Sequence, residues 1–363
     1  MLEKLTVDLG DRSYPIYIGN GLIARADLYA QHIAGKQVLV VSNETVAARY
    51  LPALQKCLPF SQTLDVCLLP DGEQYKTLDT YSQVIDTLMS KRHNRATTLL
   101  ALGGGVVGDI TGFAAATYQR GVGFMQIPTT LLAQVDSSVG GKTGVNHPGG
   151  KNMLGAFYQP QCVIIDTDVL NSLPEREFSA GLAEIIKYGL IWDGEFFSWL
   201  EDNMQALRAK EQGALVRAIK TSCQIKALVV AQDEHEKGLR AILNFGHTFG
   251  HAIEKLTNYK RYLHGEAVAI GMVMAADLSQ RSGLLSADDV DRLKVLVFAA
   301  GLPERADQDI DTQDMLNAMG MDKKVIDGVL RLILIDAIGS ARISAKVNSG
   351  FLKQTLLCSR DSG

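Results

Sequence analysis

The chain has few cysteines for its length, and their arrangement excludes several classes of protein. The 363 residues contain five cysteines, and no two of them form a C-x-x-C pair. They are Cys57, Cys67, Cys162, Cys223 and Cys358. An odd, scattered set of thiols argues against a disulfide framework and against a thiolate zinc site. We therefore expect reduced thiols and a cytoplasmic location.

Long apolar runs and an excess of one charge are also missing. The N-terminal segment carries acidic residues and has no continuous apolar core, so we expect no signal peptide. The apolar stretch 267–276 is far shorter than the ~20 residues that cross a bilayer. The net charge of −4 points to neither a nucleic acid nor a membrane surface as partner. A local basic pocket for an acidic small molecule remains compatible with this balance.

What is present is an α/β pattern followed by a helical one. Apolar residues make up 47% of the chain, and its length suits two domains of ~150–200 residues. Buried apolar strands, such as 37–41 and 97–102, alternate with helical stretches, which predicts a parallel Rossmann-like sheet. After Leu173-Pro174 most segments read as helices. We expect an α/β domain over 1–173 and a mostly α-helical domain over 174–363.

A glycine turn follows one of the predicted strands. The run Gly103-Gly104-Gly105-Val106-Val107-Gly108 fits G-x-G-x-x-G between a strand and a helix. Free N–H groups at such a helix start favour a phosphate, although the same letters also fit a simple tight turn. Other predicted strand ends carry Asp71-Gly72-Glu73 and Thr129-Thr130. Strand ends of a parallel sheet converge at one edge, which favours a cofactor site.

The segment 136–152 is rich in glycine and polar residues and carries Lys142 and Lys151. We interpret it as a long glycine-rich loop that binds a phosphate or carboxylate. The alternative is an ordinary surface loop with solvated lysines. Long loops of this composition are more often functional.

Histidines and a carboxylate in the second half suggest a metal site. His247 and His251 are four residues apart and share one face of a predicted helix, and His264 opens the next helix. Glu184 lies on an earlier helix. Two histidines and one carboxylate leave open positions on zinc, as in catalytic sites. Spacing alone favours His247 and His251 as the histidine pair, but the glutamate of H-E-x-x-H is replaced by Thr248, which argues against a metalloprotease.

Seven segments together resemble the 3-dehydroquinate synthase family, which is related to glycerol and iron-dependent alcohol dehydrogenases. They are DGEQYK (71–76), GGGVVGD (103–109), QRGVGFMQIPTTLLAQVDSSVGGKTGVN (119–146), GGKNMLGAFYQP (149–160), GLAEIIKYG (181–189), LNFGHTFGHAIE (243–254) and HGEAVAIGM (264–272). The resemblance implies a homodimeric lyase of the shikimate pathway. Such an enzyme converts 3-deoxy-D-arabino-heptulosonate 7-phosphate to 3-dehydroquinate and phosphate, with NAD+ and one divalent metal, Zn2+ or Co2+.

The resemblance also assigns roles by position. It implies that the metal ligands are Glu184, His247 and His264, so that His251 faces substrate instead. The implied substrate contacts are Arg120, Asp136, Lys142, Lys151, Asn152, Lys187, Lys226, Arg240, Asn244 and His251, with Arg120 reaching the site of a partner subunit. The implied NAD+ contacts are Asp71, Gly72, Glu73, Gln74, Tyr75, Lys76, Gly105, Val106, Val107, Gly108, Asp109, Thr129, Thr130, Lys142, Lys151, Val169, Leu170, Asn171 and Ser172. A further family lysine maps to Lys323 or Lys324.

Three alternatives stay open on the residues alone. A metal-dependent NAD polyol dehydrogenase would share the glycine turn and the metal cluster, but a simple polyol needs no basic loop. Another sugar-phosphate cyclase would act on a substrate without the carboxylate that the resemblance assigns to Arg240 and Lys226. A regulator without catalysis would keep the nucleotide fold alone.

Overall fold

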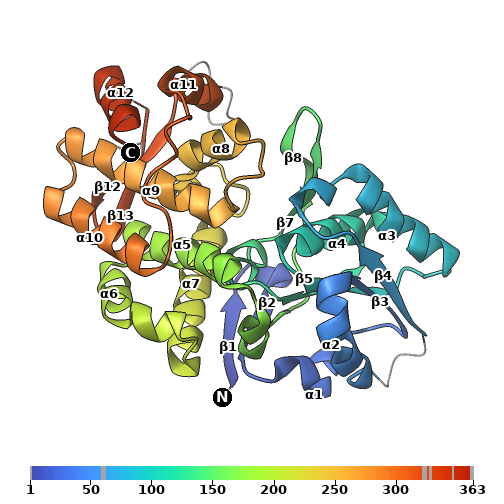
Figure 1. Ribbon diagram of the computed structural model, residues 1–363. Coiled ribbons are helices and arrows are strands. Elements are labelled where there is room, and N and C mark those ends of the chain that lie inside the picture. The colour runs from blue at the N-terminus through green and yellow to red at the C-terminus, as the bar shows by residue number, and fades with distance from the viewer. Residues whose placement is uncertain (1, 59–62, 321–324, 327–328, 346, 360–363) are drawn as a thin grey trace. The chain divides into compact units, whose positions relative to one another are not determined.

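The computed structural model describes residues 2–58, 63–320, 325–326, 329–345 and 347–359 (Figure 1). The chain forms two compact units. The first contains Met1–Leu173 and Val216–His235, and the second contains Pro174–Leu215 and Glu236–Gly363. Within the described ranges, every helix is too short or too polar to span a bilayer.

The first unit is built on a 7-stranded sheet with the order β1-β2-β9-β6-β5-β3-β4. Its strands are β1 (Leu2–Val7), β2 (Tyr14–Gly19), β3 (Gln37–Asn43), β4 (Thr63–Leu69), β5 (Thr98–Gly103), β6 (Gly123–Pro128) and β9 (Val163–Asp166). Only the β1–β2 pair is antiparallel, and the other neighbours in this sheet are parallel. Strand β5 is buried at every residue, which explains its central apolar run 99–102.

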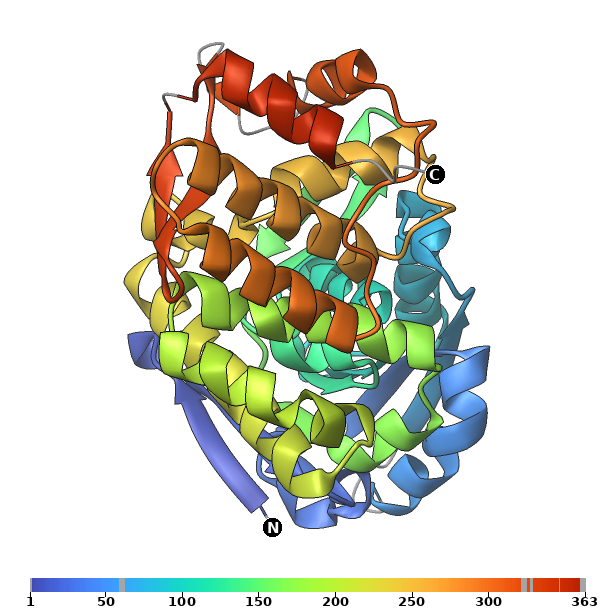
Figure 2. The same ribbon diagram turned by 60° about the vertical axis from the view of Figure 1, so that its left-hand side comes forward.

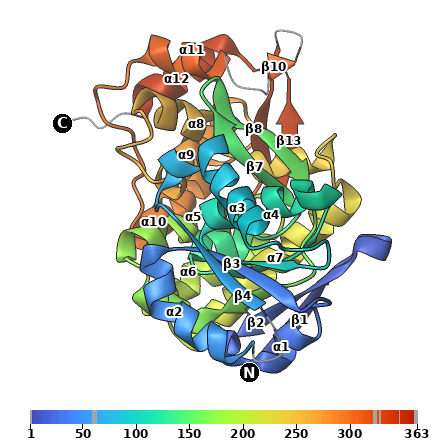
Figure 3. The ribbon, with the colours of Figure 1, turned by 90° about the vertical axis from the view of Figure 1, so that its right-hand side faces the viewer.

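Helices complete the first unit. They are α1 (Ala26–Ala30), α2 (Glu44–Lys56), α3 (Leu78–Ser90), α4 (Gly105–Thr117) and most of α7 (Gln212–Gln232). Helices α3 and α4 pack on one face of the sheet, where Val84, Leu88 and Ile110 meet Leu39 and Leu99 (Figure 3). Short turns are η1 (Gly10–Arg12), η2 (Leu22–Ala24), η3 (Glu73–Tyr75), η4 (Tyr118–Arg120), η5 (Ala133–Ser137) and η6 (Thr167–Ser172).

The predicted glycine-rich loop is wrong, because most of that segment forms a β-hairpin beside α4 (Figure 3). Strands β7 (Lys142–His147) and β8 (Gly150–Phe157) pair antiparallel. Gly144 and Gly155 lie opposite each other, and a Cβ on Gly155 would lie 2.1 Å from the Thr143 carbonyl oxygen. The glycines therefore permit a close pairing of strands, where the sequence suggested irregular backbone.

The second unit is mostly helical. Its elements are α5 (Glu175–Ile191), α6 (Gly194–Arg208), η7 (Leu239–Asn244), α8 (His247–Leu256), α9 (His264–Arg281), α10 (Ala287–Ala299), α11 (Thr312–Gly320), α12 (Ser349–Cys358) and the strands β10 (Val325–Ile326), β11 (Val329–Leu330), β12 (Leu332–Ala337) and β13 (Ser340–Ser344). Figure 2 shows the orange helices α9 and α10 side by side. Together, the parallel sheet and the helical remainder confirm the predicted fold class.

Glycines let the central helices of this unit approach closely. A Cβ on Gly265 of α9 would lie 1.9 Å from the carbonyl oxygen of Ala180 on α5. A Cβ on Gly271 of α9 would lie 2.1 Å from the carbonyl oxygen of Gly246. Because these neighbours are backbone atoms, no side chain can be added without moving a helix.

The sequence predicts one domain boundary, near residue 173, but the chain returns to the first unit further along. Residues Val216–His235 belong to the first unit. Lys220 pairs with Glu3 at 2.8 Å, and Glu234 accepts from Arg12 at 2.6 Å. The sequence predicts a helix for this segment, but a helical pattern alone does not show which unit the helix packs against.

Candidate functional site

The carboxyl ends of the parallel strands gather the polar segments of the first unit. Asp71 follows β4, Gly103 ends β5, Thr129 follows β6 and Val169 follows β9. Along the chain, β4 lies on one side of β3 and β5 on the other, so the strand order reverses there. In open α/β sheets a ligand binds outside the strand ends at such a reversal. The glycine turn that follows β5 lies at this point.

The turn itself has the geometry of a phosphate cradle. A Cβ added at Gly103 would lie 2.7 Å from the Val107 side chain. A Cβ added at Gly105 would lie 2.9 Å from the Ser137 Oγ. Gly104 is the N-cap of α4 and has no side chain to bond the first turn, whereas Asn43 caps α2 by accepting from the Val46 N–H at 2.8 Å. The unbonded N–H groups and positive end of α4 suit an anion.

A polar network joins several predicted residues beside this turn. The Lys76 Nζ donates to Asp109 Oδ2 at 2.5 Å and to Asn152 Oδ1 at 2.7 Å. Asn146 donates to Glu73 Oε1 at 2.9 Å, and Lys151 Nζ lies 3.7 Å from the same oxygen. These bonds connect the 71–76 segment, α4 and the β7–β8 hairpin within one unit. The structure therefore joins Lys76 and Asp109, which the resemblance assigned to NAD+, with Asn152, which it assigned to substrate. Lys151, which it assigned to both, lies beside Glu73 of the same network.

The remaining predicted cofactor residues line neighbouring strand ends. Thr129 is 5% exposed, and among the described residues its Oγ1 has no hydrogen-bond partner. A Cβ added at Gly104 would lie 3.1 Å from the Thr130 Cγ2. Val169 to Ser172 lie in η6, where Tyr50 donates to the Val169 carbonyl at 3.2 Å. A buried hydroxyl without a partner among the described residues is consistent with a polar ligand at these strand ends.

Two predicted substrate residues form a buried ion pair in the first unit. Lys226 on α7 donates to Asp136 Oδ1 at 2.8 Å and to the Asp136 carbonyl at 2.6 Å. The Lys226 residue is 6% exposed. Lys142 begins β7 and is exposed, and Arg120 ends η4 with a positive φ of 69°.

A buried carboxylate on α5 lies at the centre of the metal candidates. Glu184 is fully buried at 0% exposure and forms an ion pair with Lys187, one turn further along the helix. Among described residues neither Glu184 oxygen has a partner of normal hydrogen-bond geometry. A buried carboxylate in this state is costly, and a bound cation would offset that cost.

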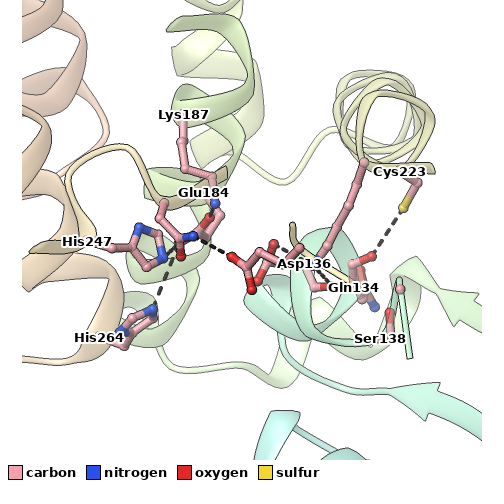
Figure 4. Close-up of polar contacts among 12 residues, drawn as sticks. Gln134, Asp136, Ser138, Glu184, Lys187, Cys223, His247 and His264 are labelled. Carbon is pink, nitrogen blue, oxygen red and sulfur yellow. Dashed lines mark hydrogen bonds and ion pairs between the residues drawn. The ribbon is translucent and has the colours of Figure 1, made fainter. Parts of the chain in front are cut away.

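Two histidines direct ring nitrogens at this carboxylate (Figure 4). His247 Nε2 lies 3.6 Å from Glu184 Oε1, and His264 Nε2 lies 4.0 Å from it. One ligand atom from each of the three residues lies within 4.8 Å of the others. Ligand atoms around tetrahedral zinc are about 3.3 Å apart, so small side-chain shifts would close the site. The chemistry and geometry of the three donors fit a divalent metal.

His251 is nearby, but its ring belongs to a different group. Its centroid lies 5.5 Å from that of His247 and 5.9 Å from that of His264. The group that it could form with a cation consists of His251, Glu254 and His264. The His247/His251 pair favoured by spacing alone is therefore not the grouping that includes Glu184.

Three polar residues escaped the sequence analysis. Glu254 faces His264 Nδ1 at 3.3 Å, and Glu236 accepts from Asn244 Nδ2 at 2.6 Å. Asn43 donates to Asp71 at 2.9 Å. Glu254 has a signal in the sequence, because it lies three residues after His251 on one helical face. Arg240 is 1% exposed, and Lys323 and Lys324 lie outside the described residues.

Known proteins match this chain over nearly its whole length. Residues 66–180 match the family described as 3-dehydroquinate synthase N-terminal, and residues 181–325 match 3-dehydroquinate synthase C-terminal. A 3-dehydroquinate synthase from Teredinibacter turnerae is 58% identical over 355 residues, covering 98% of each protein.

Two solved structures share both the fold and part of the sequence. A 2-deoxy-scyllo-inosose synthase, complexed with carbaglucose-6-phosphate, NAD+ and Co2+, has 26% identity and a TM-score of 0.89, covering 98% of this chain and 99% of that one. A 2-epi-5-epi-valiolone synthase from Streptomyces hygroscopicus, with NAD+ and Zn2+ bound, has 29% identity and a TM-score of 0.88, covering 97% and 98%. With the matches across both halves, the chain belongs to the 3-dehydroquinate synthase family.

Proposed function

We propose that this protein is a 3-dehydroquinate synthase that uses NAD+ and one divalent metal, Zn2+ or Co2+. It converts 3-deoxy-D-arabino-heptulosonate 7-phosphate to 3-dehydroquinate and phosphate. The main support for this proposal is the 58% identity to a 3-dehydroquinate synthase along 98% of the chain. The grouped donor atoms of Glu184, His247 and His264 support the metal requirement.

The first unit would hold NAD+ at the strand ends. The first turn of α4, beginning at Gly105, would bind the pyrophosphate through backbone N–H groups. Asp71 would accept hydrogen bonds from ribose hydroxyls, held in place by Asn43. Bound NAD+ would accept a hydride from the substrate and later return it, so the reaction has no net redox change.

The second unit would hold the metal through Glu184, His247 and His264. A bound divalent cation would lower the pKa of a substrate hydroxyl. Lys187 lies beside Glu184, where its ammonium group would orient a substrate hydroxyl or carboxylate. Asn244, held by Glu236, would donate to an anionic group of the substrate. These residues position the substrate and supply charge, while the substrate's own phosphate can accept the proton during β-elimination.

The basic residues account for a substrate with two anionic groups. Lys226 and Arg240 would bind the carboxylate, and Lys142, Asn152, Asn244 and His251 would bind the phosphate. Lys151 would also contact the substrate. Lysine and arginine suit these roles because charge-assisted bonds to such anions are strong. Lys76 and Asp109 hold Asn152 next to the glycine turn. Arg120 would act in the site of a partner subunit, in a cytoplasmic homodimer without nucleic-acid or membrane partners.

Phosphate release tests this proposal. Purified protein with the heptulosonate phosphate, zinc and substoichiometric NAD+ should release phosphate over many turnovers, and a chelator should abolish the reaction. Accumulation of NADH in proportion to turnover, or absence of phosphate, would refute it. Sedimentation velocity would test the homodimer separately.

A related sugar-phosphate cyclase is the second candidate, because two structural neighbours are synthases of other cyclitols. Their identities of 26% and 29% are far below the 58% of the 3-dehydroquinate synthase. Sedoheptulose 7-phosphate and glucose 6-phosphate in the same assay would decide between them. Net oxidation of glycerol by NAD+ would instead favour a polyol dehydrogenase.

A further inference from the structure

Glu254 is a buried carboxylate that neither the proposed metal ligands nor the substrate contacts include. It lies on α8, seven residues after His247, and is 3% exposed. Its Oε1 lies 3.3 Å from the Nδ1 of His264 on α9. Burying a carboxylate costs free energy, so its presence next to a candidate metal ligand calls for a compensating interaction.

The two histidines of the metal group share one arrangement. His247 turns Nε2 toward Glu184 and places Nδ1 3.1 Å from the Phe245 carbonyl oxygen. His264 turns Nε2 toward Glu184 and places Nδ1 beside Glu254. A carbonyl and a carboxylate oxygen both accept hydrogen bonds, so each ring is held with its proton on Nδ1. The lone pair of each Nε2 then faces Glu184, as metal binding requires.

We propose that Glu254 is a positioning residue, which fixes the tautomer and the ring orientation of His264 for a divalent metal held by Glu184, His247 and His264. The inference rests on the proposed function, because that function supplies the metal. His247 needs no carboxylate for the same purpose, since the backbone of Phe245 already accepts from it. His264 is the first residue of α9 and is partly exposed, so a side chain on another helix must hold its ring.

The neighbouring group His251, Glu254 and His264 also has the donor types of a cation site. If a metal bound there, Glu254 would be a metal ligand and not a hydrogen-bond acceptor for His264 Nδ1. Within that group, the atom of His264 that faces Glu254 is Nδ1. Two metals on one ring would require the imidazole to lose both ring protons. One metal on Nε2 and a hydrogen bond from Nδ1 satisfy both nitrogens of a neutral ring.

Metal affinity tests the inference with three variants. Glu254→Ala removes the acceptor, and Glu254→Gln keeps an acceptor oxygen but removes the charge. Asp277→Asn is the matched control, because Asp277 is also a hydrogen-bonded carboxylate. It lies on α9, the helix that begins with His264, but is thirteen residues and about 20 Å from His264. Zinc dissociation constants are measured by competition with a chromogenic chelator, independently of catalysis.

We expect Glu254→Ala to weaken zinc binding about 10- to 100-fold, the usual effect of removing such an outer partner. Glu254→Gln should fall between Ala and wild type, and Asp277→Asn should bind zinc as wild type does. Nitrogen NMR of histidine-labelled protein should show the Nδ1–H tautomer of His264 in wild type and a mixture of tautomers in Glu254→Ala. Should the Ala variant not fold, Glu254→Gln carries the test.

Unchanged zinc affinity and an unchanged His264 tautomer in a folded Glu254 variant would overturn the inference. So would loss of a second zinc equivalent, because Glu254 would then be a ligand itself. Wild-type protein that binds zinc but releases no phosphate would refute the proposed function, and the effect of Glu254 on zinc would still be measurable.

Discussion

Replacing Gly265 with alanine should weaken metal binding strongly, although Gly265 is not itself a candidate metal ligand. An added Cβ would lie 1.9 Å from the Ala180 carbonyl oxygen, and real Cβ contacts essentially never fall under 3.0 Å. The backbones of α5 and α9 must therefore separate by at least 3.0 − 1.9 = 1.1 Å. Ala180 lies one turn before Glu184, and Gly265 directly follows His264. The shift therefore acts on the distance between these two donors.

A movement of this size is large on the scale of metal coordination. Ligand distances in metal sites hold to within about 0.2 Å, so a 1.1 Å shift exceeds the tolerance several-fold. Overpacking of this kind also costs about 1–3 kcal/mol of folding free energy. We therefore expect Gly265→Ala to fold with a lower Tm and to bind zinc at least 100-fold more weakly, which removes about 2.7 kcal/mol of zinc-linked stabilisation.

The assay compares thermal unfolding with zinc and with a chelator. Wild type should lose stability when the chelator replaces zinc, and in Gly265→Ala this loss should be smaller by about 2.7 kcal/mol. Gly213→Ala is the control, since nothing lies within 4 Å of a Cβ there, and it should keep the zinc-dependent difference. Wild-type zinc affinity in a folded Gly265→Ala variant would refute the packing argument.

Three further outcomes are expected. His264→Ala should lose zinc and turnover while retaining most of its NAD+ affinity, measured by metal analysis and fluorescence titration; normal zinc content with full activity would contradict the ligand assignment. Lys226→Met should raise the KM for the sugar phosphate about tenfold or more, because Asp136 and the substrate lose a charge-assisted donor, with zinc content unchanged; an unaltered KM would exclude the contact. Burial raises the pKa of Cys223 to about 12, so iodoacetamide at pH 8 should modify the exposed Cys358 and leave Cys223 intact by mass spectrometry; labelling of Cys223 in native protein would show that it is accessible.

Patterns of buried strands were sufficient to predict the sheet. Residues 38–41 are continuously apolar, and the observed strand Gln37–Asn43 extends beyond the predicted 37–41 by two polar residues. The β7–β8 hairpin escaped prediction because its strands contain three glycines and two lysines, residue types that are depleted in strands. Its close pairing depends on Gly144 and Gly155, whose missing side chains look like loop signals in the sequence.

The metal group shows where periodicity stops being informative. A spacing of four residues places His247 and His251 on one helical face, but it cannot say which partner faces them across the structure. Glu184 and His264 come from other helices. The sequence made both of them candidates, but only the family resemblance selected the set Glu184, His247 and His264 over the pair His247 and His251. The spacing of Glu254 from His251 is a weak signal, because a glutamate near a helix end is normally a solvated surface residue. Its role depends on contact with His264, ten residues further along the chain.

The return of the chain to the first unit at Val216–His235 has a consequence for biosynthesis and for protein engineering. Glu3 and Asp136 can meet Lys220 and Lys226 only after these lysines have been made, and by then residues 174–215 of the second unit have been synthesised. The N-terminal unit therefore cannot finish folding as an independent vectorial step. A fragment that ends at residue 173 would leave Asp136 without the ammonium group that bonds it. Circular permutants or fragments that keep residues 216–235 with the sheet should be the ones that fold.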